Sequence, residues 1–137
     1  MNRILAAAAL VTLPVVLMAA AFAAQDRYAL QVPGGLAFAE FKGYEDWEVI
    51  SISHNGDKIA LIVGNPAMIE AYKSGIPGNG KPFPDGAMMA KTHWMANKHE
   101  DQPGEPIVAG ALHDVDLMVK DSKRFRDGGG RGWAEFE

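Results

Sequence analysis

The chain has 137 residues, which predicts a single domain, and it carries a formal net charge of −4. A mildly acidic domain lacks the basic stripe with which proteins bind nucleic acid, so we expect no nucleic-acid partner. The chain contains no cysteine. Disulfides, thiolate metal sites and thiol nucleophiles are therefore excluded, and the core must hold itself together by packing.

The first 23 residues resemble a cleavable signal peptide. Arg3 supplies the positive end, an apolar run follows, and the small residues at Ala21 and Ala23 suit signal peptidase, so we place the cleavage after Ala23. A retained membrane anchor is the alternative, but Pro14 interrupts the run and no basic stop-transfer cluster follows. We therefore expect residues 24–137 to form an exported, periplasmic domain with no membrane contact after cleavage.

The sequence at the start of this domain predicts a short helix and then a β-hairpin. Residues 36–41 favour the helix, and residues 47–54 alternate as a strand does. Asn55 and Gly56 follow as a favoured two-residue turn, because both tolerate positive φ. The chain then returns as a second strand over residues 58–63.

The next signal is a helix followed by a long loop. Asn65 can cap free backbone amides and Pro66 is suited to the first helical position, so we expect a helix as far as Lys73. Residues 74–86 are crowded with Gly and Pro and predict a loop. Loops of this length in a compact domain are often functional.

The remaining chain predicts three more strands. They cover residues 88–97, residues 107–119 with a bend near Gly110, and residues 132–136, while a short helix is expected over 121–125. The predicted fold class is therefore α+β, a mainly antiparallel β-sheet of about five strands with a few short helices.

Lys91 is the first candidate for chemistry, because it lies in the middle of a predicted strand among methionines and Trp94. A lysine amine in apolar surroundings loses its proton more readily and becomes a nucleophile. The plainer interpretation is a lysine on the solvent side of the strand, with its stem lying over the methionines.

Asp114 and Asp116 are the second candidates, because they lie on one side of the fourth strand. Paired carboxylates can share protons or bind a cation, but a solvated strand face carries the same residues, and we favour that interpretation here.

The four histidines show no metal-ligand spacing and are interpreted as surface or half-buried residues. They are His54, His93, His99 and His113.

Five stretches, spread over about residues 41–136, resemble a known family when they are taken together. They are 44–50 (YEDWEVI), 64–66 (GNP), 81–91 (KPFPDGAMMAK), 118–125 (MVKDSKRF) and 132–134 (GWA). As a set they are similar to the cytochrome P-460 family, which includes cytochrome c′-beta.

The resemblance implies a periplasmic, mainly antiparallel β fold, usually dimeric, that carries a c-type haem and passes electrons to a periplasmic acceptor. In the cytochromes P-460 proper, a lysine is joined to the haem edge and the enzyme oxidises hydroxylamine. Lys91 matches that lysine in its motif. Asp116 falls near a pocket carboxylate that assists proton removal in some members. Members with an apolar pocket bind nitric oxide instead.

One departure from the family is serious. The family attaches haem through Cys-x-x-Cys-His, and this chain contains no cysteine. Our expectation is that the domain is incomplete at its C-terminus and that its complete form is the haem protein. The alternative is a haem-free periplasmic module on the same fold, which binds a small ligand or a partner through loop 74–86 and the strand faces. A remnant without function is the third possibility.

Overall fold

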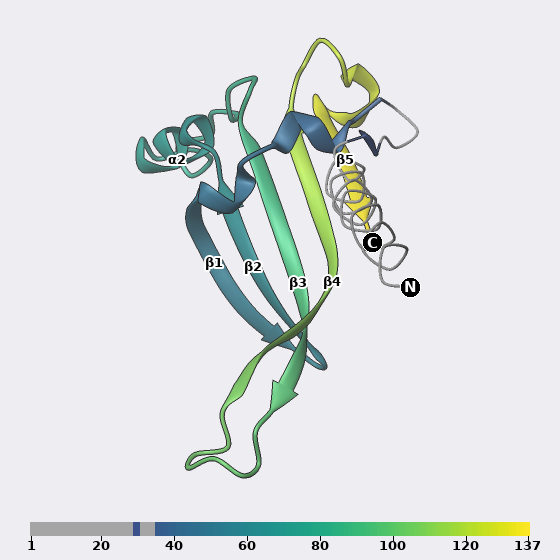
Figure 1. The fold of residues 1–137 in the computed structure, drawn as a ribbon. Coiled ribbons are helices and arrows are strands. Elements are labelled where there is room, and N and C mark those ends of the chain that lie inside the picture. The colour runs from purple at the N-terminus through teal and green to yellow at the C-terminus, as the bar shows by residue number, and fades with distance from the viewer. Residues whose placement is uncertain (1–28, 31–34) are drawn as a thin grey trace, which may run out of the picture.

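The computed structural model describes residues 29–30 and 35–137, so the predicted signal peptide lies outside the described residues. Five antiparallel strands follow one another across a single sheet, in the order β1-β2-β3-β4-β5 (Figure 1). They are β1 (Glu48–Asn55), β2 (Lys58–Gly64), β3 (Met88–Lys98), β4 (Ile107–Lys120) and β5 (Arg131–Phe136). The helices are η2 (Phe38–Phe41), η3 (Tyr44–Asp46), α2 (Pro66–Lys73) and η4 (Arg126–Gly128). The α+β prediction is confirmed.

The described part of the chain holds no helix that is both long and apolar enough to span a bilayer.

The hairpin between β1 and β2 forms where it was predicted, but its turn lies one residue later. Asn55 pairs with Lys58, so the two turn residues are Gly56 and Asp57. Gly56 has φ 62°, the left-handed conformation that glycine adopts without strain. The register of the β1–β2 pair therefore places Gly56 and Asp57 in the turn.

The predicted cap of α2 is confirmed, and it also ties three elements together. The side-chain oxygen of Asn65 accepts hydrogen bonds from the backbone amides of Met68 and Met88, both at 3.0 Å. Its amide nitrogen donates to the Gly86 carbonyl at 2.8 Å. One side chain therefore fixes the start of α2 against the start of β3.

The helix predicted over residues 121–125 is wrong in extent. Asp121 does cap a turn, accepting from the amides of Lys123 and Arg124 at 3.0 Å each, but the chain then leaves the helical path. The Phe125 ring lies so close to Gly132 of β5 that a Cβ there would be 2.4 Å from it. Packing of this ring against β5 favours a tight turn over a continuing helix.

The main hydrophobic core lies on one side of the sheet, beneath the segment that precedes β1. This segment crosses the sheet in Figure 1 and places Leu36 and Phe41 against strand residues such as Leu117, and all three are at most 1% exposed. Arg124 donates two hydrogen bonds to Glu40, at 2.7 and 3.0 Å, and so ties the segment to the β4–β5 connection. We call this side the core face.

On the other side of the sheet, a smaller buried cluster packs Met68 of α2 against Met118 of β4 and Ala87.

Candidate functional site

The opposite side of the sheet, which we call the site face, carries both residues singled out from the sequence. Lys91 on β3 and Asp116 on β4 are direct register partners, so their side chains leave the sheet on the same side. Together they line a cavity of about 380 Å³. Its other lining residues are Ile62, Met89, Met118 and Trp133.

This cavity combines an apolar lining with one ammonium and one carboxylate. Lys91 and Asp116 are both half-buried, and the Asp116 Oδ2 atom lies 3.9 Å from Nδ1 of His93. Within residues 29–30 and 35–137, the Lys91 ammonium has no carboxylate within 4.0 Å. The site therefore presents a cation that is not held in an ion pair, beside a carboxylate that can accept a proton.

Asp114 corrects the prediction of a solvated strand face. Its side chain is only 4% exposed, and its carboxylate accepts hydrogen bonds from Nδ1 of His93 and, at 2.5 Å, from Nδ1 of His113. Lys58 lies 3.9 Å away. Burial would raise the pKa of Asp114, but the two histidine hydrogen bonds outweigh burial and hold this pKa below its ordinary value.

A local irregularity of the sheet explains this arrangement. His93 of β3 pairs with Asp114 of β4, whereas the next residue, Trp94, pairs with Leu112. His113 of β4 therefore has no register partner on β3. Its ring is free to turn toward Asp114. The predicted bend near Gly110 belongs to the same irregular stretch, where β4 twists sharply (Figure 1).

Sequence reasoning did not bring these histidines together with the aspartates. Rules for metal-ligand spacing compare residues within one helix or strand, whereas these histidines and aspartates lie on two neighbouring strands. Residues 91 and 93 face residues 116 and 114 on the neighbouring antiparallel strand. By contrast His54 is exposed, and the His99 ring lies near the side chains of Asn97, at the end of β3, and Gln102, in agreement with the plain interpretation.

Two of the stretches that carried the family resemblance, 81–91 and 118–125, also meet in a contact outside the cavity. Asp85 accepts hydrogen bonds from the Lys120 ammonium at 3.1 Å, from the Ser122 amide at 2.9 Å and from the Ser122 hydroxyl at 2.6 Å. The Ser122 hydrogen bonds, followed by Lys120, lower the pKa of Asp85 to about 2. This contact joins the end of the Gly/Pro loop to the end of β4.

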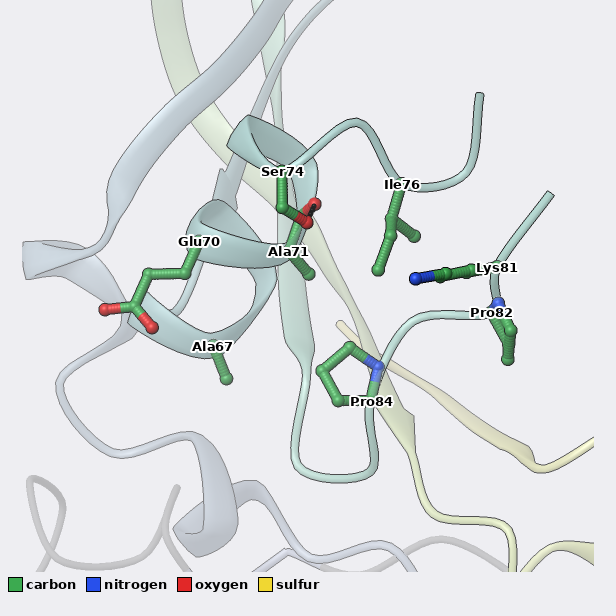
Figure 2. A pocket seen from close by; sticks show the side chains of 8 residues that line it. All are labelled: Ala67, Glu70, Ala71, Ser74, Ile76, Lys81, Pro82 and Pro84. Atoms are coloured by element: carbon green, nitrogen blue, oxygen red, sulfur yellow. Dashed lines mark hydrogen bonds between the residues drawn. The ribbon is translucent and has the colours of Figure 1, made fainter. Parts of the chain in front are cut away.

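The Gly/Pro loop 74–86 forms a second cavity with α2, of about 480 Å³. Figure 2 shows the Lys81 side chain reaching toward Ile76, while the Glu70 carboxylate lies on the other side of the helix. The cavity is also lined by Ala67, Ala71, Ser74, Pro82 and Pro84. The loop predicted as functional therefore does frame a concave surface, with one cation against small apolar groups.

A mainly antiparallel sheet is the fold that the family resemblance implied. The family model described as Cytochrome P460 matches residues 41–137. The chain therefore belongs to the cytochrome P460 family, a family of haem-binding proteins. No curated protein matches the chain.

The cavity on the site face offers a haem an apolar contact surface but neither a histidine ligand nor a cysteine attachment point. Ile62, Met118 and Trp133 offer apolar surface against which a flat macrocycle can lie, with Lys91 beside it. None of the six residues that line the cavity is a histidine, and the whole chain contains no cysteine for a thioether bond. These residues therefore provide a contact surface for the group, without the imidazole ligand and the thiols of a c-type attachment.

Proposed function

We propose that this protein is an exported haem protein of the P460 type whose site face oxidises hydroxylamine or binds nitric oxide. The observation that carries the proposal is the cross-strand pair of Lys91 and Asp116 in an otherwise apolar cavity. Haem, when bound, supplies a redox-active iron, and the chain supplies its surroundings.

Asp116 is proposed as the proton acceptor. An ionised carboxylate is acceptor-only, and this one lies in the cavity beside apolar residues, where a small substrate can reach it. Hydroxylamine carries protons that must leave when it is oxidised, whereas nitric oxide carries none. A carboxylate in the cavity therefore supports hydroxylamine oxidation over nitric oxide binding as the main activity.

Lys91 is proposed as the residue that contacts the edge of the macrocycle. Its ammonium is half-buried and has no carboxylate partner among the described residues, so it can pair with an anionic or electron-rich group placed on the cavity. Trp133, although 62% exposed, lines the same cavity and can cover the macrocycle by stacking.

The experiment is to isolate the protein made from its own gene in its own host and to record its intact mass and its visible spectrum. We expect a haem absorption band. We also expect Asp116→Asn to lose hydroxylamine oxidation about 100-fold, as removal of a general base does, while nitric oxide still changes the spectrum. Asp101→Asn, in an exposed loop, is the matched control. A colourless protein with the mass of the bare polypeptide would overturn the haem proposal.

A second candidate function is a haem-free module that binds a small ligand, and the loop cavity favours it. Lys81 and the apolar groups around it suit a small molecule with one acidic group. Lys81→Met separates the two proposals. It would weaken ligand binding in the loop cavity and leave any haem absorption unchanged. Lys91→Met would change the haem absorption and leave ligand binding in the loop cavity unchanged.

We also propose the partners that the family resemblance implies, a homodimer and a periplasmic electron acceptor. Edge strand β1 supports the dimer, because Val49 and Ile52 on it are 54% and 71% exposed. Sedimentation at several concentrations tests the dimer. Ile52→Lys should return it to a monomer without changing the fold, whereas Glu45→Lys, beyond the strand, should not.

A further inference from the structure

A cluster of two imidazoles and two carboxylates lies beside the cavity that Lys91 and Asp116 line, and we name it the imidazole–carboxylate cluster. Its members are His93, His113, Asp114 and Asp116. One ligand atom each from His93, Asp114 and Asp116 lies within 4.8 Å of the other two. Three possible ligands therefore already surround one point.

The backbone holds these side chains in place. His93 and Asp114 are register partners on β3 and β4, the most extensively paired strands of the sheet, and Asp116 is two residues further along the same side. The irregularity at Leu112 brings His113 to the second oxygen of Asp114. Sites built on strands keep their geometry better than sites built on loops, so the cluster is preorganised.

The charges of the cluster also suit a divalent cation. Asp114 is nine-tenths or more buried, and a buried carboxylate needs compensating positive charge or hydrogen bonds. Lys58 is the one ammonium near it, at 3.9 Å, and is itself 36% exposed. Lys91 is the register partner of Asp116 but does not come within 4.0 Å of its carboxylate, so the two carboxylates are only partly compensated and can accept a bound cation. Binding of the cation through His93 Nδ1 would displace to solvent the proton that this atom shares with Asp114.

We propose that the imidazole–carboxylate cluster binds a divalent transition-metal ion of the zinc class. His93 Nδ1, one Asp114 oxygen and one Asp116 oxygen are the ligands, solvent completes the coordination, and His113 holds the other Asp114 oxygen through its hydrogen bond. Imidazole nitrogen with carboxylate oxygen is the donor set that Zn²⁺ accepts, whereas Ca²⁺ and Mg²⁺ take oxygen ligands. Donor atoms bound at about 2.0–2.2 Å to one tetrahedral ion lie roughly 3.3 Å apart, so binding would move Asp116 inward and would separate His93 Nδ1 from the Asp114 oxygen to which it is hydrogen-bonded.

The metal proposal does not rest on haem binding, because zinc content and haem iron are measured separately. The experiment removes bound metals from the full chain with a chelator, titrates it with ZnCl₂ by calorimetry, and counts bound zinc after dialysis. We expect one Zn²⁺ per chain. His93→Gln should weaken binding at least about tenfold, and Asp116→Asn should weaken it in the same direction.

The controls are His54→Gln and His99→Gln, histidines outside the cluster, which should leave zinc binding unchanged. Circular dichroism identifies any variant that fails to fold, and half-exposed Asp116 gives a ligand variant that does not disturb the buried Asp114. Two results would overturn the proposal: no saturable zinc uptake by the wild-type chain, or uptake that is the same in His93→Gln and Asp116→Asn as in wild type.

Discussion

The two sides of the same sheet differ sharply in what their side chains do. On the core face, β3 and β4 supply Ala90, Val115 and Leu117, all at most 4% exposed beneath the segment before β1. On the site face, the alternate residues of the same strands are Lys91 and Asp116, together with the buried Asp114 and its histidines. One step along either strand, from Ala90 to Lys91 or from Val115 to Asp116, therefore moves from a residue packed in the core to one with a proposed chemical role.

The largest expected effect tests the core face. Phe41 is fully buried and packs against Trp47, with 6.2 Å between the ring centroids. Phe41→Ala should lower the free energy of unfolding by about 3–5 kcal/mol, because it removes apolar contacts and leaves a cavity. Trp133→Ala, on the site face and 62% exposed, should change it by less than about 1 kcal/mol. Urea denaturation measures both, and equal losses would contradict the division between the faces.

The next effect tests whether Asp114, on the site face, stabilises the fold. Asp114→Asn should lower the free energy of unfolding by about 1.5–3 kcal/mol, because the amide cannot accept both histidine hydrogen bonds as the charged group does. Asp116→Asn, which is 36% exposed, is the matched control and should lose less than about 1 kcal/mol. If both variants unfold at the same urea concentration as wild type, Asp114 is not structural.

A third prediction concerns the close approach of the β4–β5 connection to β5. Gly132→Ala should cost about 1–3 kcal/mol, because the new Cβ meets the Phe125 ring and displaces it. Gly128→Ala has open space around the added carbon and an ordinary φ, so it should be nearly neutral. Thermal unfolding of the pair tests this. If Gly132→Ala and Gly128→Ala have the same melting temperature, the Phe125 ring moves aside without an energetic cost.

The smallest expected effect depends on pH and belongs to neither face. The folded pKa of Asp85, about 2, lies below its ordinary value of 3.8, so its contribution to stability is complete above the ordinary value and disappears as the pH falls through about 2. The melting temperature of Asp85→Asn should therefore lie below that of wild type near neutral pH, and the gap should close in acid. A gap that stays constant with pH would argue against the ionised Asp85 contact.

Some parts of this protein could be predicted from local residues. Asn65 followed by Pro66 predicted the cap and start of α2, because capping depends on one side chain and the next three amides. The strands were found from alternation, to within about a residue or two, because period two reflects burial on one side. Lys91 and Asp116 were singled out from strand alternation and then from the family resemblance, and the structure brings them to one cavity. Their roles remain proposals.

Other parts required the tertiary structure. Which two residues form the first hairpin turn, and where the helix after Asp121 ends, depend on register and on the Phe125–Gly132 contact. The burial of Asp114 depends on a strand irregularity that leaves His113 without a partner across the sheet. Sequence by itself determined the class of fold, the elements and the two candidate residues, because these follow from local periodicity and short patterns. Tertiary structure decided which polar groups meet, because that depends on contacts between strands far apart in the chain.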